Sequence, residues 1–296
     1  MRRAVAESRI PAAPAAGDGS WIYVRLLRYV PSRIPGPAPE DEAPDMSNNL
    51  RDDAPVVYFV SDVHLGGSQG TAETEKQTRF QGLLQRVRSE KASLYVLGDL
   101  FDFWFTYRRV IPRAGFGILA RLEAMAGDGA DIRYLGGNHD FWIEGFLRED
   151  TRIEVIPDHT RILAQGKVIE LAHGDGLGPG DTGYKILKRV LRNRAAISLF
   201  RWVHPDLGIP LGLRSSHVSR ESTADHPVDT EALYRHVGLP ALADGADAFL
   251  MGHHHVAVHI SRDSGDFMIL GDWFRQYTCA RLREGKLEML RWPLTD

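Results

Sequence analysis

Five short polar sequences in this chain contain side chains that bind transition metals, and each directly follows a hydrophobic run. They are Ser61-Asp62-Val63-His64, Gly98-Asp99-Leu100-Phe101-Asp102, Gly137-Asn138-His139-Asp140, His173-Gly174-Asp175 and Gly252-His253-His254-His255. Taken singly, an Asp or His at the end of a strand is usually a capping or hydrogen-bonding residue. Five in chain order are difficult to explain by capping, and together they predict a metal site.

The types of ligand indicate which ions would bind and what chemistry they would support. Imidazole, carboxylate and amide oxygen suit Mn, Fe, Zn or Co better than Ca or Cu(I). A carboxylate such as that of Asp99 can bridge two ions about 3.5–4 Å apart, and such a pair deprotonates water at neutral pH. The same ions neutralise charge on a phosphoryl group under attack. The residues therefore predict hydrolysis of a bond to phosphorus.

The hydrophobic runs before these sequences have the length and composition of β-strands. They cover residues 56–60, 94–97, 132–135, 168–172 and 248–251. Residues 77–88 and 116–125 carry apolar side chains at helical spacing between them. Strands that alternate with helices predict an α/β architecture, with the site along the strand ends.

The order Asp-x-His, Gly-Asp-x-x-Asp, Gly-Asn-His-Asp, His-Gly-Asp and Gly-His-x-His, over about residues 56–275, resembles the calcineurin-like metallophosphoesterases. The resemblance implies a two-sheet sandwich flanked by helices and two divalent metal ions, with Mn²⁺ expected and Fe or Zn as alternatives. By position, the first ion would bind Asp62, His64, Asp99 and His255. The second would bind Asp99, Asn138, His173 and His253. Asp99 and His139 would be catalytic, with His139 facing the phosphoryl group.

Residues 97–104, 137–142 and 173–184 resemble one branch of that family, the UDP-2,3-diacylglucosamine hydrolases of lipid A synthesis. This branch implies a helical cap inserted at about residues 181–236. It also implies cleavage of the pyrophosphate of UDP-2,3-diacylglucosamine to UMP and 2,3-diacylglucosamine 1-phosphate. The substrate contacts it implies are Asn138, His139, Asp181, Tyr184, Ser219 and His253. The sequence departs from close members at His139 and His254, where they often carry arginine and threonine.

Two other functions are compatible with parts of this pattern. One is a phosphodiesterase or phosphatase that acts on another nucleotide or phospholipid. An apolar cleft between the cap and the core would favour a lipid substrate, and a purely polar cleft would favour a nucleotide or nucleic acid. The other is a metal-free binding scaffold, against which the complete set of ligands argues. The remaining histidines have no ligand spacing and are interpreted as structural or surface residues: His159, His204, His217, His236 and His259.

The segment between Lys185 and Arg220 is strongly basic, with eight Lys or Arg residues against one acid, Asp206. Four of these cations recur at helical spacing, and a second face of the same predicted helix is apolar: Lys185, Lys188, Arg189 and Arg192, then Ile186, Leu187, Val190 and Leu191. This pattern predicts binding to an anionic membrane surface or lipid, with a solvated surface helix as the alternative.

The whole chain of 296 residues has a net charge of −3, which excludes a globally basic nucleic-acid binder. No apolar run reaches the ~18 residues of a membrane span. A single cysteine, Cys279, cannot form an internal disulfide, so we expect a reducing compartment such as the cytoplasm. The resemblance and the basic segment further imply peripheral association with the inner face of the bacterial inner membrane. Residues 1–54 are proline-rich and predicted to be a disordered tail before a domain at 55–296, with Met46 as an alternative start. The sequence indicates no oligomeric state.

Overall fold

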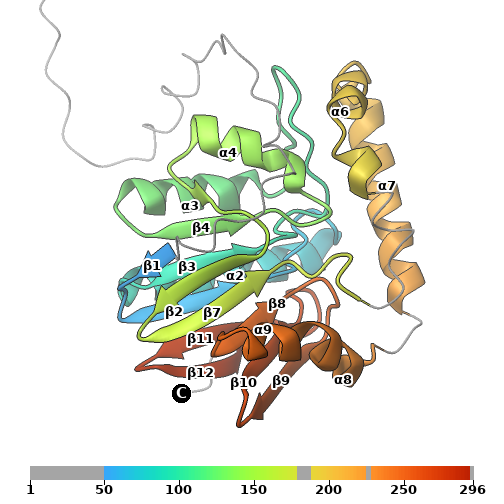
Figure 1. The fold of residues 1–296 in the computed structure, drawn as a ribbon. Helices are drawn as coiled ribbons and strands as arrows, with labels where there is room; N and C mark the ends of the chain where they lie inside the picture. The colour runs from blue at the N-terminus through green and yellow to red at the C-terminus, as the bar shows by residue number, and fades with distance from the viewer. Residues whose placement is uncertain (1–49, 179–187, 225–227, 294–296) are drawn as a thin grey trace, which may run out of the picture. The chain divides into compact units, whose positions relative to one another are not determined.

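A computed structural model describes residues 50–178, 188–224 and 228–293, and for 218–224 the backbone alone. Two six-stranded sheets form its centre (Figure 1). The first sheet has the order β12 (Lys286–Arg291), β11 (Thr278–Arg283), β2 (Val56–Val60), β3 (Ser93–Leu97), β4 (Ile132–Leu135), β5 (Glu154–Val155). The second has the order β1 (Leu50–Asp52), β6 (Thr160–Ala164), β7 (Lys167–Ala172), β8 (Ala248–Met251), β10 (Gly265–Leu270), β9 (Ala257–Arg262). The predicted two-sheet fold is confirmed.

Three neighbouring strands in the middle of each sheet run parallel. In the first sheet β2, β3 and β4 pair in parallel, and in the second β7, β8 and β10 do so. The carboxyl ends of parallel strands lie at one edge of a sheet, so the loops after these six strands can meet there. All five polar sequences and one further loop, after β10, follow these strands.

The central strands β2, β3, β4 and β8 bury both faces, which is why they read as continuous hydrophobic runs. Val57, Phe59 and Tyr95 of the first sheet pack against Ile169 and Met268 of the second. The alternate side chains of the first sheet pack under α2 (Gly70–Ser89), α3 (Phe116–Gly127), the 3-10 turn η2 (Phe141–Ile143) and α4 (Glu144–Asp150). The outer face of the second sheet is covered by α8 (Thr230–Leu233), the π-helical η3 (Tyr234–Gly238) and α9 (Leu239–Ala243).

The inserted segment between β7 and α8, described over residues 188–224, is called the cap and includes α6 (Arg194–Phe200) and α7 (Pro205–Ala224). Its inner side packs on the loop after β3 through Ile197, Phe200, Ile209 and Leu213, against Phe103, Phe105 and Tyr107. Leu233 and Tyr234 pack on the second sheet, so the last residues expected in the cap, up to about 236, lie against the core.

The basic segment of the cap is oriented differently from the lipid-facing arrangement that its pattern suggested. Residues 188–191 are helical, and Lys185 lies outside the described residues. Lys188 forms ion pairs with Asp175 and Asp158 of the core, and the Arg192 guanidinium lies 4.8 Å from the centroid of the Phe141 ring. The prediction that these two cations meet lipid is therefore wrong, because the spacing of a helix shows which residues share a face but not which face meets the core.

The folded chain begins before residue 55, where the sequence placed its start. Leu50–Asp52 pairs in parallel with β6. Asp52 is buried, accepts a hydrogen bond from Ser93 Oγ at 3.0 Å and lies 3.5 Å from an Arg133 nitrogen. A three-residue strand has no periodicity of its own to read, and its stability comes from these distant partners. A chain that begins at Met46 would retain this strand.

Candidate metal centre

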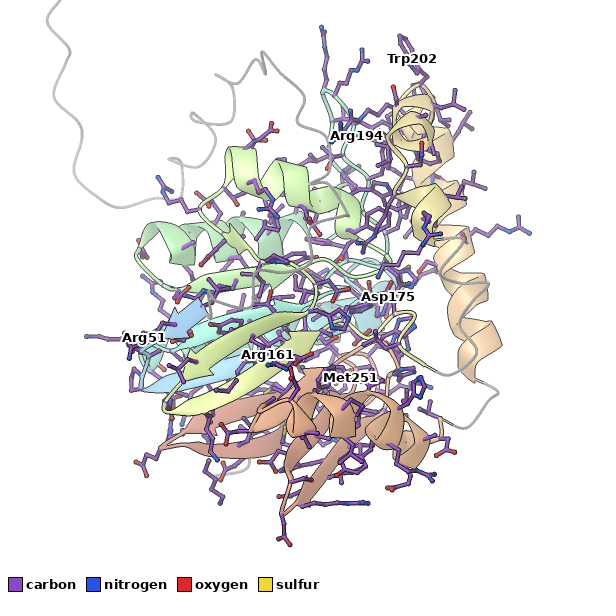
Figure 2. The ribbon with its side chains drawn as sticks, in the orientation of Figure 1. Arg51, Arg161, Asp175, Arg194, Trp202 and Met251 are labelled. Carbon is purple, nitrogen blue, oxygen red and sulfur yellow. The ribbon has the colours of Figure 1, made fainter. Side chains whose placement is uncertain are left out.

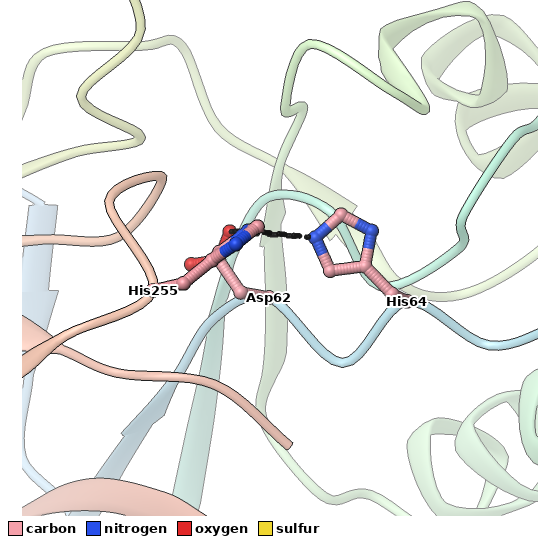
Figure 3. Close-up of side chains that lie close together, drawn as sticks. All are labelled: Asp62, His64 and His255. Carbon is pink, nitrogen blue, oxygen red and sulfur yellow. Dashed lines mark hydrogen bonds and ion pairs between the residues drawn. The ribbon is translucent and has the colours of Figure 1, made fainter. Parts of the chain in front are cut away.

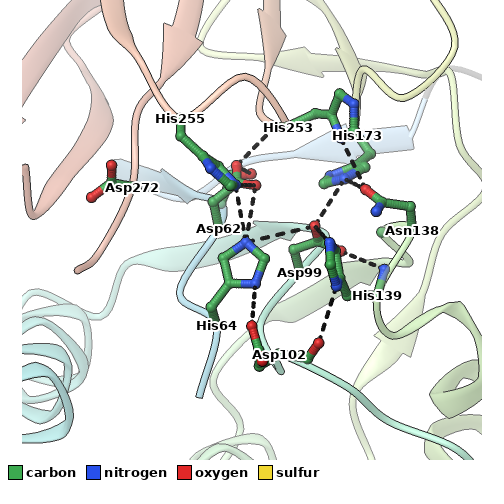
Figure 4. A network of polar contacts seen from close by, with 12 residues as sticks. Asp62, His64, Asp99, Asp102, Asn138, His139, His173, His253, His255 and Asp272 are labelled. Carbon is green, nitrogen blue, oxygen red and sulfur yellow. Dashed lines mark hydrogen bonds and ion pairs between the residues drawn. The ribbon is translucent and has the colours of Figure 1, made fainter. Parts of the chain in front are cut away.

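Five loops, three from the first sheet and two from the second, bring one group of ligand atoms together. Asp62 and His64 follow β2, Asp99 follows β3, and Asn138 and His139 follow β4. His173 follows β7, and His253 and His255 follow β8. Figure 4 shows these side chains turned toward one another around Asp99. The structure therefore brings together every metal ligand that the sequence predicted.

Five of the predicted ligands have left-handed backbone conformations. The φ angles are 55° at Asp62, 50° at His64, 54° at Asp99, 69° at His253 and 53° at His255. Side-chain-bearing residues rarely adopt this region, and each such residue costs on the order of 1 kcal/mol or more. The strands and the loop hydrogen bonds maintain these conformations, which is the pattern expected where function rather than stability determines the backbone.

The first group of ligand atoms lies where the loops after β2 and β8 meet (Figure 3). His64 Nε2 is 3.1 Å from His255 Nε2 and 3.7 Å from Asp62 Oδ1, and His255 Nε2 is 3.3 Å from Asp62 Oδ1. Asp99 Oδ2 is 3.8 Å from His64 Nε2. Ligands about 2.0–2.2 Å from one ion lie at roughly such separations from each other.

The second group shares the same Asp99 oxygen. His173 Nε2 lies 3.4 Å from Asp99 Oδ2 and 2.9 Å from Asn138 Oδ1. His253 Nδ1 is also 2.9 Å from Asn138 Oδ1. Asp99 Oδ2 is therefore a neighbour of both groups, as a bridging carboxylate requires.

Two carboxylate oxygens support the fit of metal ions to this site. Asp62 Oδ1 and Asp99 Oδ2 are buried, and neither has a hydrogen-bond partner among the residues that the structure describes. A buried ionised oxygen without a hydrogen bond is costly unless a cation compensates it. The cluster combines imidazole, carboxylate and amide donors, which is the set that transition metals take.

Hydrogen bonds behind the ligands fix their orientation. His173 Nδ1 lies 2.8 Å from Leu97 O, so its Nε2 faces the site. His64 Nδ1 lies 3.2 Å from Asp102 Oδ1, which leaves its Nε2 for the metal. Such partners set the tautomer of a ligating histidine and raise its basicity. Asp102 belongs to the second polar motif of the sequence, but no role was predicted for it.

Close approach of the backbone also shapes the bridge. A Cβ at Gly137 would overlap the Asp99 carboxylate, so this position of the loop after β4 accommodates only glycine. Asp140 ties the same two loops together, because its carboxylate accepts from Gly137 N at 3.0 Å and Phe101 N at 3.0 Å. Burial, followed by the charge of Asp99, raises the pKa of Asp140 to about 6.

A sixth loop, which was not predicted from the sequence, follows β10 and borders the site. Asp272 Oδ1 accepts hydrogen bonds from the backbone N–H groups of Phe274, Arg275 and Gln276, which folds this loop tightly. The Phe274 ring then lies 5.8 Å from the His64 ring and 5.3 Å from the His255 ring, between centroids. The signal was present, since Gly271-Asp272 also follows a hydrophobic strand directly.

His139 lies beside the metal ligands with one nitrogen committed to the backbone. Its Nδ1 is 3.0 Å from Asp102 O, a carbonyl that can only accept, so Nδ1 carries hydrogen. Nε2 faces the site, 3.8 Å from Asp99 Oδ2. Burial lowers the pKa of His139. Because Nδ1 keeps its hydrogen, Nε2 can donate a proton only from the imidazolium form, which is present below the pKa and lost as pH rises through it.

The surrounding carboxylates raise the pKa of two of the ligand histidines. Burial by itself would lower the pKa of His64, but the neighbouring carboxylates of Asp102, Asp62 and Asp99 outweigh it and raise the pKa to about 9. Burial also opposes protonation of His173, yet the neighbouring Asp99 raises its pKa well above the usual value. His253 differs, because burial and then the charge of His173 lower its pKa to about 3.

Metal binding should therefore release protons and weaken in acid. At pH 7 His64 lies below its raised pKa and must lose a proton to bind an ion, and the raised pKa of His173 acts in the same direction. We expect proton release on saturation with Mn²⁺, and an affinity that falls as pH decreases. Calorimetric titrations in buffers of different ionisation enthalpy count these protons. Binding without proton release at pH 7 would contradict this description of the site.

The remaining predicted substrate residues cannot be placed. Asp181 and Tyr184 lie outside the described residues, and the backbone alone is described at Ser219. Asn138, His139 and His253 lie in the site as above.

Two of the histidines without ligand spacing lie beside acidic side chains outside the site. His159 Nδ1 is 3.9 Å from Glu170 Oε1, and His259 Nε2 is 2.8 Å from Asp266 Oδ1.

The fold and the ligand set agree with comparisons to known proteins. The profile of the calcineurin-like phosphoesterase family matches residues 55–257, which is more than half of the chain. The chain belongs to this family and is a metallophosphoesterase, a hydrolase that uses divalent metal ions.

Its similarity extends to proteins of one named activity. A UDP-2,3-diacylglucosamine hydrolase of Porphyromonas gingivalis is 31% identical over 242 residues, 76% of this chain and 92% of that protein. One from Neisseria meningitidis serogroup B is 27% identical, covering 75% of this chain and 91% of that protein. Among solved structures, a phosphoesterase from E. coli matches with 16% identity and a TM-score of 0.43, covering 79% of this chain and 92% of that one.

Proposed function

We propose that this protein hydrolyses the pyrophosphate bond of UDP-2,3-diacylglucosamine, giving UMP and 2,3-diacylglucosamine 1-phosphate, a step of lipid A biosynthesis. The observation that carries the proposal is the joint presence of a two-ion ligand set around Asp99 and an apolar cap beside it. Similarity to hydrolases of this name over most of both chains supports the choice of substrate.

Each ligand has a proposed role in this reaction. One ion would be held by Asp62, His64, Asp99 and His255, and the other by Asp99, Asn138, His173 and His253. When bound, the two ions supply an activated water at neutral pH and neutralise charge on the phosphoryl group under attack. We propose Mn²⁺ as the metal, with Fe or Zn as alternatives of similar ligand preference.

The chain's own side chains would act on the phosphoryl group next to these ligands. Asn138 Oδ1 and His253 Nδ1 lie 2.9 Å apart. These two residues would orient a phosphoryl oxygen beside the second metal ion. His139 Nε2 would hydrogen-bond the phosphoryl or leaving oxygen as an imidazolium. Attack on the phosphorus nearer uridine would leave the second phosphate on the sugar. Asp181, Tyr184 and Ser219 are proposed as further substrate contacts.

The cap packs on the core through apolar side chains, and we propose that the acyl chains insert along this interface. Phe103, Phe105 and Tyr107 are buried in a cluster with Phe200 of α6, with the Phe105 and Phe200 rings 4.6 Å apart. The cluster continues to Trp142, which follows the Asn138 loop and whose ring lies 5.5 Å from that of Phe105. An apolar interface that begins beside the phosphoryl site fits a lipid better than a nucleic acid or a soluble nucleotide.

The outer face of the cap is also apolar, and we propose that it binds an anionic bilayer. Leu199, Trp202, Leu207 and Leu211 are 73%, 75%, 69% and 61% exposed, and Figure 2 shows Trp202 at the outer end of the cap. A large exposed apolar patch usually marks an interaction site. The cations Arg189 and Arg214 are exposed on the same segment. Among the described residues, no helix is long and apolar enough to cross a bilayer.

A triple substitution tests this surface. Leu199→Ser, Trp202→Ser and Leu207→Ser together should weaken binding to anionic liposomes by at least ~100-fold, since each buried large apolar side chain contributes about 1.5–3 kcal/mol. Flotation of the protein with vesicles measures the binding, and binding should also weaken with salt. Leu239→Ser on α9, which is 41% exposed, is the matched control and should change little. Unchanged binding of the triple variant would refute the membrane proposal.

The substrate assignment is tested by parallel assays with added Mn²⁺. We expect turnover of UDP-2,3-diacylglucosamine to exceed that of UDP-N-acetylglucosamine and of a generic phosphodiester by several orders of magnitude in kcat/KM. Equal turnover of the soluble nucleotide sugar would instead favour a nucleotide pyrophosphatase. Turnover of a phospholipid diester alone would favour a lipid phosphodiesterase.

A further inference from the structure

Lys188 joins the cap to the loop that carries a ligand of the second metal position. Its Nζ lies 2.9 Å from Asp175 Oδ2 and 3.5 Å from Asp158 Oδ2. The Asp175 side chain is fully buried, and that of Lys188 is 22% exposed. Figure 2 places Asp175 on the side of the core that faces the cap. These are partly buried ion pairs, unlike the exposed pairs that contribute little elsewhere on the surface.

Both carboxylates are connected to His173. Asp158 Oδ1 accepts a hydrogen bond from the His173 backbone N–H at 3.1 Å, and Asp175 is the second residue after His173. One cation on the cap therefore compensates two acidic side chains that enclose a ligand residue. Removal of a cation from beside a buried carboxylate weakens the compensation of its charge, which is relieved by movement of the chain or by capture of another cation.

A second contact also runs from a cation of the cap to a loop of the core. Arg192, one helical turn after Lys188, lies with its guanidinium 4.8 Å from the centroid of the Phe141 ring. Phe141 is the third residue after Asn138, and its backbone N–H donates to Gly137 O at 3.1 Å. The two cap cations thus reach the two loops that supply His173 and Asn138. In the proposed assignment, these two ligands and His253 bind the second ion only.

We infer that Lys188 is a positioning residue for the second metal ion: through Asp158 and Asp175 it holds the His173 loop in its ligating position. The inference rests on the proposed assignment of the two ions but not on the lipid substrate. It gives the cap a function in metal binding besides substrate binding.

The test compares Lys188→Met with Lys188→Arg, and uses Arg189→Met as a matched control at the exposed neighbouring position. Titration with Mn²⁺ in a calorimeter gives the affinity of each of the two ions. We expect Lys188→Met to bind the second ion about 10–100-fold more weakly, as loss of an outer-shell partner does, with the first ion little changed. Lys188→Arg should recover most of the affinity, and Arg189→Met should match the wild type.

Hydrolysis of bis(p-nitrophenyl) phosphate, measured at limiting and at saturating concentrations of Mn²⁺, provides a second readout. At limiting Mn²⁺, kcat for this small diester should fall by the same factor in Lys188→Met, with KM nearly unchanged, and saturating Mn²⁺ should restore part of it. Two ions bound with wild-type affinity would overturn the inference. So would weakening of both ions equally, with a lower melting temperature, because that result indicates a merely structural role.

If Lys188→Met does not fold, Lys188→Gln provides the same test, because it retains a donor to Asp175 without the charge. A weaker second ion in that variant supports the inference, and wild-type affinity overturns it. Neither outcome depends on the acylated substrate. A failure of the lipid assignment would therefore be seen separately, as full metal loading without turnover of UDP-2,3-diacylglucosamine.

Discussion

Asp99→Ala is expected to abolish hydrolysis and metal loading together. Asp99 Oδ2 lies 3.8 Å from His64 Nε2 and 3.4 Å from His173 Nε2, so one carboxylate serves both groups of ligands. With it removed, each group loses its shared anionic ligand and neither ion retains a complete set. We expect a drop of more than ~10³-fold in kcat/KM, and loss of both ions from the chain by elemental analysis.

A carboxylate outside the site is the control for this variant. Asp128→Ala removes a surface acid that pairs with Arg88 at 2.9 Å, and it should leave both turnover and metal content near the wild-type values. Near wild-type turnover in Asp99→Ala, with the fold intact by circular dichroism, would refute the dinuclear assignment.

His139→Ala is expected to separate metal binding from catalysis. His139 contributes no atom to either proposed ligand set, and its Nδ1 is directed to Asp102 O at 3.0 Å. The variant should therefore bind two ions with nearly unchanged affinity while kcat falls by about 10²–10⁴-fold, the usual contribution of a positioned acid or base. Metal titration and steady-state kinetics on the same preparation measure both quantities.

The role of His139 can be resolved further with His139→Arg. A guanidinium supplies positive charge but cannot give up its proton. Substantial activity in His139→Arg, with none in His139→Ala, would indicate that charge is the contribution. Inactivity of both would indicate proton donation. Loss of metal from His139→Ala would contradict the assignment to the phosphoryl group.

Most of the candidate site could be predicted because its residues follow strands directly. The position of Asp62 after β2 or of His173 after β7 is a local property, and the parallel pairing of central strands brings such loops to one edge. The helices at 77–88 and 116–125 are confirmed within α2 and α3 for the same reason, since their spacing is local.

Features that depend on distant partners were not predicted. β1 forms because β6 is there to pair with it, and three residues carry no pattern. The direction of Lys188 is set by Asp158 and Asp175, which precede it in the chain by many residues. Amphipathic spacing identified two faces of this segment, but the neighbour that each face meets is decided by tertiary packing.

The products formed in water enriched in heavy oxygen test the central claim most directly. The Mn²⁺-loaded protein would be incubated with UDP-2,3-diacylglucosamine, and both products would be weighed by mass spectrometry. We predict that UMP gains one heavy oxygen and that 2,3-diacylglucosamine 1-phosphate gains none, with no reaction in the presence of a chelator. Heavy oxygen in the lipid phosphate, or turnover unaffected by the chelator, would contradict the account.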